Sequence, residues 1–363
     1  MQQRVDMLSG SITKGLFAMT LPIMLMNVMQ SLFNIFDMIV LKRFAEGSAV
    51  GAVGAASTLI TLCTALVVGL SSGANVVVAR RIGMGVQKRV DNAVTTSLAL
   101  VVISGLLLMG VGVVFAKTFL VMSNCPESLL EQSTLYFRIY FYSVPLFVLY
   151  TFCGAILRAA GDARTPMYLL ILGSAVKLLV TIFFESVFHM GVAGVAWSTA
   201  VSNLITAALS LIAVLKREDF RVDFSKLRFF SSELTEMLHI GILTGLQSVT
   251  YSLANVIILA TVNKFGADAT TGVSIANQFD GLMYQVIHAP SLAATPYVAQ
   301  NIGAGQFDRM KKAIISSVLI TTGIGAVLGA FSAIFSGQLA RLMSDSPAAI
   351  EYAQQKMHIS PVL

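Results

Sequence analysis

The feature that most constrains this chain is a series of long apolar stretches that recur along its whole length. Soluble domains carry about 25% charged residues, whereas this 363-residue chain has 12% charged and 56% hydrophobic residues and a mean hydropathy of +0.80. Apolar runs of about 20 residues are typical of membrane-spanning helices, and barrel strands are shorter and alternate in polarity. The sequence therefore predicts an all-α polytopic membrane protein.

Nine complete spans are expected, and a tenth begins near the end of the sequence. They cover residues 15–41, 49–79, 90–116, 132–158, 166–189, 191–215, 235–263, 269–299, 310–335 and 348 onward. The first run is too long for a signal-peptide h-region and has no cleavage site after it, so we expect a retained helix. A polar stretch then divides the chain into an N-lobe (1–215), a cytoplasmic linker (216–234) and a C-lobe (235–363).

The net charge of +6 is explained by topology and not by a nucleic-acid partner. If the N-terminus is cytoplasmic, sixteen of the 24 Lys and Arg residues fall on inside segments and five fall outside. Cytoplasmic segments of membrane proteins are enriched in Lys and Arg. We therefore expect a multi-pass membrane protein with its N-terminus in the cytoplasm.

Two segments repeat each other at an offset of 220 residues. Val78–Ala93 aligns without gaps to Val298–Ala313, and both contain Ile-Gly-x-Gly followed by an arginine, Arg89 or Arg309. Both copies lie on the cytoplasmic side, which indicates a parallel repeat of six helices plus six. Only about four helices of the second lobe are present, so we interpret the sequence as a fragment or a truncated gene product.

Ionisable groups inside a bilayer are costly and are functional candidates for that reason. Asp37 lies near the outer third of the first span, where it could bind a proton or Na⁺, or instead extend toward Lys42 and Arg43. Lys177 and Glu185 lie two turns apart in the fifth span. They could neutralise each other, or Glu185 could be a further proton or cation site.

The eighth span contains a second group of polar residues. Asp280 is about eleven residues into it, with Asn277, Gln278 and Tyr284 nearby. These side chains could bind a substrate or orient the acid, or could join helices by hydrogen bonds. Asn34, Lys177 and Gln247 complete the expected substrate cavity.

Prolines within spans break backbone hydrogen bonds and can act as hinges, and Pro290 and Pro296 in the eighth span are the strongest candidates. The repeated Gly-x-Gly lacks the strand and the Lys-Ser/Thr of a phosphate loop, so we expect tight turns there. The three cysteines have no metal-ligand spacing. We expect no enzymatic activity, no cofactor and a monomer.

Several motifs together resemble the MATE (multidrug and toxic compound extrusion) transporters in a bacterial form. They lie at residues 33–40, 155–166, 191–196 with 202–203, 277–284, and 299–305 with 309. The resemblance covers essentially the whole chain and implies a twelve-helix, two-lobed antiporter. Such a protein expels organic cations or other amphipathic compounds in exchange for H⁺ or Na⁺. Asp37 matches the family's acid in the first helix, and Asp280 stands where related members carry one in the eighth.

The chain departs from the family pattern at several positions. Lys42 replaces a small residue, Leu243 replaces a proline, and Lys177, Thr181 and Glu185 differ from a more neutral, Asn-containing fifth helix. Two alternatives to drug export stay open: a flippase for lipid-linked precursors, which would favour several cavity cations, and a truncated remnant that does not transport.

Overall fold

The computed structural model describes residues 5–44, 47–123, 125–220, 229–262, 265–341, 343 and 346–359. Regular secondary structure within these residues is helical, with no strand in the described part of the chain. The helices are α1 (Ile12–Phe44), α2 (Gly47–Gly83), α3 (Gln87–Met122), α4 (Glu127–Ala159), α5 (Arg164–Phe188), α6 (Val192–Leu215), α7 (Ser231–Val262), α8 (Ala267–Ile287), α9 (Ala289–Gly303), α10 (Phe307–Arg341) and α11 (Pro347–Ile359). The predicted all-α class is confirmed.

Seven of the described helices are long and apolar enough to cross a membrane: α1, α2, α3, α4, α5, α6 and α10. Large apolar side chains lie exposed on their outer faces, for example Leu107 and Val114 of α3 and Leu319 of α10. An exposed apolar surface of this extent is stable in lipid and not in water. The span expected over 235–263 also forms one helix, α7, although it is not among the seven.

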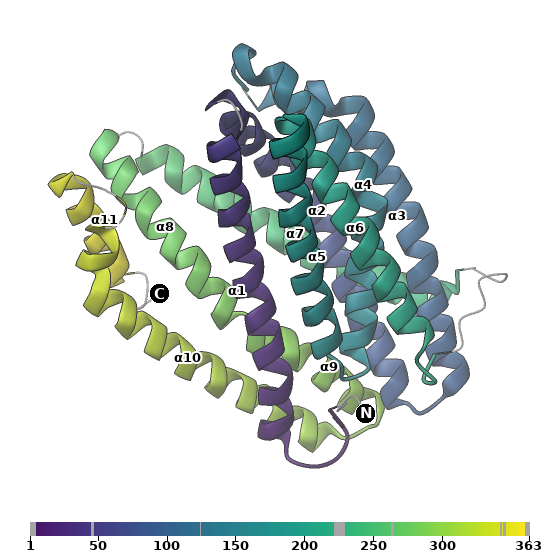
Figure 1. The fold of residues 1–363 in the computed structure, drawn as a ribbon. Coiled ribbons are helices and arrows are strands. Elements are labelled where there is room, and N and C mark those ends of the chain that lie inside the picture. The colour runs from purple at the N-terminus through teal and green to yellow at the C-terminus, as the bar shows by residue number, and fades with distance from the viewer. Residues whose placement is uncertain are drawn as a thin grey trace.

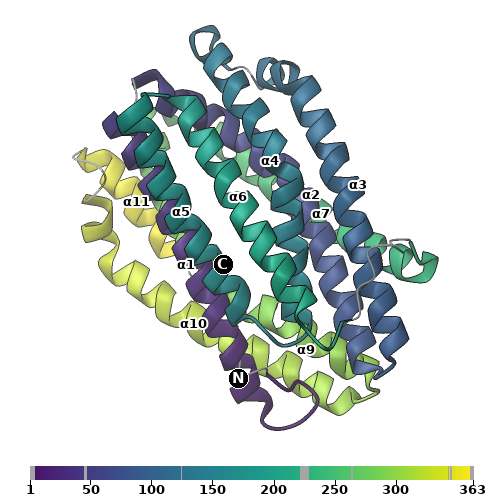
Figure 2. The ribbon, with the colours of Figure 1, turned by 45° about the vertical axis from the view of Figure 1, so that its right-hand side comes forward.

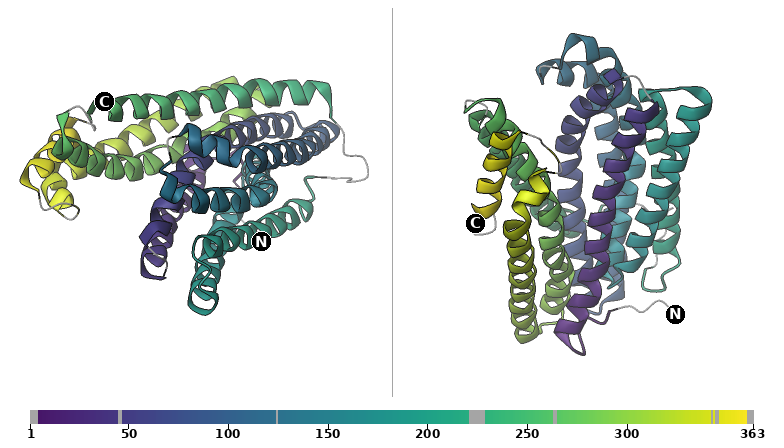
Figure 3. Two further views of the ribbon diagram at one scale, coloured as in Figure 1. Left: turned by 90° about the horizontal axis from the view of Figure 1, so that it is seen from above. Right: turned by 60° about the vertical axis from the view of Figure 1, so that its left-hand side comes forward.

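The bundle has two parts, and one helix from each part packs against the other part. Helices α2, α3, α4 and α6 form one part, and α8, α10 and α11 form the other, with α1 between them (Figures 1 and 3). Helix α7 packs along α2, and α1 packs along both α5 and α9 (Figure 2). Residues 221–228 of the predicted linker (216–234) lie outside the described residues, and the division into two lobes stays a prediction.

The eighth span was expected to be one helix over 269–299, and this is wrong. Helix α8 ends at Ile287, and α9 begins at Ala289. Pro290 stands in the first turn of α9, where it cannot donate the hydrogen bond that a continuous helix requires. Pro296 lies inside α9 without breaking it. Of these two prolines, only Pro290 therefore explains the interruption. A hinge movement at Pro290 or Pro296 stays a prediction.

The repeat is visible in the geometry of two turns. Gly85 has φ +69° and Gly305 has φ +70°, a left-handed conformation that favours glycine. The backbone N–H groups of both glycines donate to the carbonyl three residues earlier, Ile82 or Ile302, at 3.0 and 3.1 Å. The prediction of tight turns at these glycines is confirmed.

The ends of α2 and α9 cross in a reciprocal contact. A Cβ placed on Gly83 would lie 2.0 Å from the carbonyl oxygen of Gln300, and one placed on Gly303 would lie 2.1 Å from that of Arg80. Gly83 and Gly303 are repeat partners, and so are Arg80 and Gln300. Contacts that exchange partners in this way are those of a two-fold axis, which supports a parallel repeat.

Glycines also allow α2 and α7 to pack closely, with the two helices antiparallel. A Cβ on Gly69 would lie 2.5 Å from the nitrogen of Gly245, and one on Gly73 would lie 2.3 Å from the carbonyl oxygen of Met237. Small residues let backbones approach closely where lipid offers no competing hydrophobic force. This contact holds α7 against the first part of the bundle.

Candidate functional site

A cavity of ligand size lies inside the predicted N-lobe. It has a volume of about 600 Å³ and is lined by α1, α2, α4, α5 and α6. Aromatic side chains form much of its wall. They are Phe33, Tyr136, Tyr140, Phe147 and Tyr150. Ligand pockets are commonly of this size and mostly apolar, with a few polar groups that orient the ligand.

Lys177 of α5 is the one charged residue among the described residues that line this cavity. The hydroxyls on the α2 and α6 sides mostly donate to backbone carbonyls. Thr64 donates to Ile60 at 2.8 Å, and Ser202 donates to Gly173 at 2.7 Å. The amide of Asn203 donates to Ser143 Oγ at 3.0 Å. These groups offer mainly acceptor lone pairs to the cavity, whereas Lys177 offers an ammonium group.

Helix α1 carries the predicted acid of the N-lobe. Gln30 and Phe33 line the cavity, and Asp37 is one helical turn beyond Phe33. The side chains of Asn34 and Asp37 lie outside the described residues, and their predicted roles stay predictions.

The acid of the predicted C-lobe is ion-paired. Asp280 Oδ2 of α8 lies 3.3 Å from Lys356 Nζ of α11, and both side chains are about a quarter exposed. Lys356 also donates to Asn277 Oδ1. The structure therefore brings Asp280 and Asn277 together, as predicted, around a cation that the sequence reasoning did not assign to them.

Tyr284 takes part in a stack of three rings. Its ring lies 5.6 Å from that of Tyr251 and 5.3 Å from that of His288, at interplanar angles of 15° and 18°. Gln278 of α8 and Gln247 of α7 are exposed. The structure thus joins α7, α8 and the start of α9 through aromatic contacts, with Gln247 one turn before Tyr251.

Glu185 is placed apart from the N-lobe cavity. It is 1% exposed, and its Oε2 accepts the backbone N–H of Gly191 at 3.0 Å across the turn between α5 and α6. Thr181 donates to Ser198 Oγ at 2.6 Å between the same two helices. These contacts join α5 to α6, and a coupling role for Glu185 stays a prediction.

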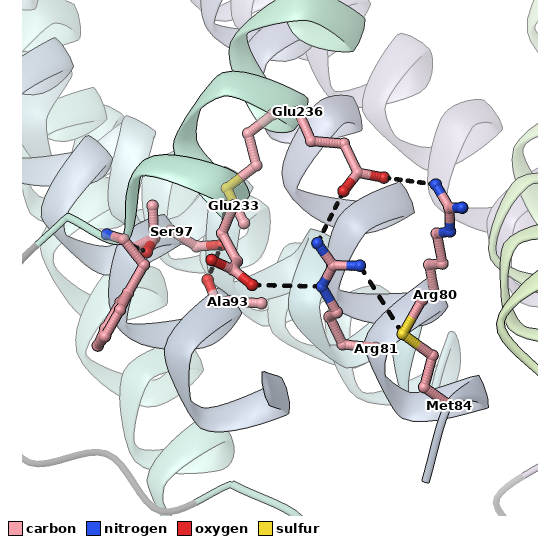
Figure 4. Close-up of polar contacts among 10 residues, drawn as sticks. Arg80, Arg81, Met84, Ala93, Ser97, Glu233 and Glu236 are labelled. Carbon is pink, nitrogen blue, oxygen red and sulfur yellow. Dashed lines mark hydrogen bonds and ion pairs between the residues drawn. The ribbon is translucent and has the colours of Figure 1, made fainter. Parts of the chain in front are cut away.

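Four charged residues join α2 to α7 where α2 ends, and we call them the interlobe ion-pair cluster (Figure 4). Glu236 accepts from Arg80 Nη1 and from Arg81 Nη2, each at 2.9 Å. Arg81 Nε also lies 3.4 Å from Glu233 Oε1, and the Arg81 side chain is only 5% exposed. A buried guanidinium that bridges two carboxylates fixes the relative position of the two helices.

A second set of contacts at the same end of the bundle holds the segment before α1. Arg309 donates to the carbonyls of Ser9 and Gly10 at 2.8 and 2.9 Å, and Asn301 donates to that of Met7 at 3.0 Å. The hydroxyl of Ser9, the backbone N–H of Leu8 and the charge of Arg309 lower the pKa of the Asp6 carboxyl. The repeated turn between α9 and α10 therefore anchors the start of the chain.

A helical bundle with an exposed apolar surface, an internal ligand-sized cavity and two parts joined at one end defines a polytopic membrane transporter. The family model described as MatE matches residues 22–183 and 244–360. The chain therefore belongs to the MATE family of membrane multidrug efflux transporters, and the predicted resemblance is confirmed.

Other relatives and solved structures agree with this assignment. The chain is 26% identical to "Probable multidrug resistance protein YoeA" of Bacillus subtilis (strain 168), over 96% of this chain and 77% of that protein. It is 25% identical to "FAD transporter" of Shewanella oneidensis, over 97% and 79%. The structure titled "Outward-facing conformation of a multidrug resistance MATE family transporter of the MOP superfamily" matches with TM-score 0.91 at 22% identity, over 99% and 81%.

The sequence reasoning missed two sets of residues. It assigned Arg80 and Arg81 only to membrane topology and placed Glu233 in the linker. It also gave Lys356 no role. A signal for the first set was present, because Glu233 and Glu236 lie three residues apart at the start of a helix and so share one face. Nothing in the sequence alone pairs α8 with α11.

Proposed function

We propose that the chain is a secondary active exporter of amphipathic small molecules, driven by exchange for H⁺ or Na⁺. The observation that carries this is the cavity of about 600 Å³ among α1, α2, α4, α5 and α6. It has the size and the mixed aromatic and polar lining of a small-molecule site. The family assignment supports transport in a membrane.

The proposed mechanism is alternating access between the two parts of the bundle. With the N-terminus in the cytoplasm of a bacterial cell, the crossing of α2 and α9 and the interlobe ion-pair cluster lie at the cytoplasmic end. Both sets of contacts join the two parts at that end, which supports an outward-facing state in this proposal. The cytoplasmic end would open by separating these contacts, while the other end closes around the cavity.

In this proposal Asp37 is the coupling acid of the N-lobe. It is four residues beyond Phe33, which lines the cavity. Binding of a proton or Na⁺ to this acid would change the charge that a substrate meets. Asp280 is the second candidate, and its pairing with Lys356 means that ion binding there would compete with an existing cation.

The flippase alternative has less support. Arg138 is exposed on α4 and is outside the described lining, so among the described residues Lys177 is the one cation in the cavity. A pyrophosphate group would require several positive groups for compensation.

Transport is tested with the full chain reconstituted in vesicles under an imposed H⁺ or Na⁺ gradient, with a panel of fluorescent amphipathic dyes. We expect gradient-driven movement of at least one dye, and loss of its ion dependence in Asp37→Asn. Asp308→Asn is the matched control, because Asp308 is an exposed acid in the first turn of α10. Movement that is absent under both gradients in correctly inserted protein would contradict the proposal.

A further inference from the structure

The segment before α1 bridges two parts of the fold, and we call residues 5–10 the N-terminal strap (Figure 1). The backbone N–H of Val5 donates to the carbonyl of Gly161, in the turn after α4, at 3.1 Å. The amide of Asn301, on α9, donates to the carbonyl of Met7 at 3.0 Å. The strap is therefore bound on one side to the turn between α4 and α5 and on the other side to α9.

The guanidinium group of Arg309 binds the strap to α10. Its Nη1 donates to the carbonyl of Gly10 at 2.9 Å, and its Nη2 donates to the carbonyl of Ser9 at 2.8 Å. The same group donates to the hydroxyl of Tyr297 at 3.2 Å. A guanidinium has five donors in a fixed geometry, and hydrogen bonds from a charged donor are stronger than neutral ones. One side chain at the start of α10 therefore fixes the position of the strap.

An apolar contact accompanies these hydrogen bonds. Met7 is 1% exposed, and it belongs to a buried cluster whose other members come from both sides of the strap. Ala163 lies between α4 and α5, Tyr297 lies on α9 and Ala313 lies on α10. If the two parts of the bundle separated here, Met7 could not keep all of these neighbours.

The repeated turn itself does not require the contact with Arg309. Arg89 is the repeat partner of Arg309, and its side chain is exposed. The turn at Gly85 nevertheless has the same backbone conformation as the turn at Gly305. The arginine that follows the second turn thus has a task beyond the structure of the turn, which is to bind the strap.

We propose that the N-terminal strap is a latch that keeps the end of the bundle where α2 and α9 cross closed, and that Arg309 holds this latch in place. Opening of this end would require the strap to leave either Arg309 or Gly161. Because the strap continues into α1, its release would also free the start of a helix that lines the N-lobe cavity. The inference rests on the alternating access of the proposed function, whereas binding of the strap is measured independently of transport.

Attachment of the strap is tested by the reactivity of a single cysteine in the purified full chain, in a background without the three cysteines. Met7→Cys is expected to react with a maleimide at least about tenfold more slowly than Lys14→Cys, because Met7 is buried and Lys14 is exposed. Mass spectrometry follows both rates. Adding Arg309→Gln should accelerate labelling of Met7→Cys about tenfold, the equivalent of one hydrogen bond from a charged donor. Arg89→Gln is the matched control and should not change the rate.

The latch itself is tested by distances between spin labels at Gln87 and Lys312, which report the separation of the two parts. Arg309→Gln should add a population at longer distance, since release of the strap favours the open state. Met7→Ala removes the apolar contact and leaves Arg309 intact, so it should have the same effect and serves if Arg309→Gln does not fold. Arg89→Gln should leave the distances unchanged.

Each result supports or contradicts a different part of the proposal. Equal labelling rates for Met7→Cys and Lys14→Cys would show that the strap is not bound. Faster labelling in Arg309→Gln with an unchanged distance distribution would show that the strap is bound but is not a latch. If labelling and distances both change as expected while no gradient moves any dye, the latch stands and the export function fails.

Discussion

At the scale of single residues, the intramembrane charges of this chain are held in three different ways. Asp280 is paired with Lys356 on a neighbouring helix. Glu185 accepts a backbone N–H across a turn, and Lys177 faces a cavity. The sequence predicted all three as candidates because charges in lipid are costly. It could not predict these differences, because each depends on which helix packs beside the charge.

The pairing of Asp280 with Lys356 leads to a prediction about stability. Asp280→Asn leaves a partly buried ammonium without its counter-charge, and we expect the free energy of unfolding to fall by about 1–2 kcal/mol. Adding Lys356→Met should recover most of that loss, since neither charge then remains. Thermal unfolding of the two single variants and the double variant measures the coupling. Additive losses would show that the pair contributes nothing.

Two substitutions of Glu185 can distinguish a structural role of this acid from a role in ion coupling. Glu185→Gln keeps an oxygen that can accept the Gly191 N–H, so we expect the unfolding free energy to change by less than about 1 kcal/mol and ion-driven export to persist. Glu185→Ala removes the acceptor and leaves a void, at a cost of about 2–3 kcal/mol. Unfolding and export are measured on both variants. Loss of ion-driven export in a stable Glu185→Gln variant would instead make this acid a coupling site.

At the scale of helices, apolar run length predicted most elements to within a few residues of their ends. The expected span 132–158 is α4 (Glu127–Ala159), and 191–215 is α6 (Val192–Leu215). The exception is the span expected over 269–299. Pro290 was predicted to be a hinge there, but the helix was expected to continue through it. A proline inside an apolar run can either bend a helix or interrupt it, and only the packing of α9 against α1 and α2 decides between these outcomes.

The crossing of α2 and α9 predicts that two glycines will respond differently to the same change. Gly83→Ala would place a Cβ 2.0 Å from the Gln300 carbonyl oxygen, and the required shift should cost about 1–3 kcal/mol. Gly110→Ala on α3 meets nothing within 4 Å and should be neutral or stabilising by up to about 1 kcal/mol. Thermal unfolding of both variants tests this, and equal effects would argue against the close crossing.

At the scale of the whole molecule, we expect the interlobe ion-pair cluster to set the equilibrium between two conformations, in which this end of the bundle is closed or open. Glu236→Gln removes the carboxylate that Arg80 and Arg81 share, so the closed state of this end should become less populated. Spin labels at Gln87 and Lys312, in a background without the three cysteines, report the separation of the two parts. We expect a new population at longer distance.

The control for this measurement is Glu131→Gln, because Glu131 is an exposed acid on α4 near the opposite end of the bundle. It should leave the distance distribution unchanged. An unchanged distribution in Glu236→Gln as well would mean that the glycine contacts alone keep this end closed.

The reciprocal contact of Gly83 with Gln300 and of Gly303 with Arg80 also bears on how such a chain could arise. Two copies of a half-length protein related by a two-fold axis would make this contact twice with the same residues. In such a dimer any substitution changes both copies at once. Fusion into one chain removes that restriction, and the repeat partners have since diverged. Arg81 now bridges two carboxylates, whereas Asn301 binds a backbone carbonyl. In a chain that arose in this way, one half could join its partner by charge and the other by a neutral amide.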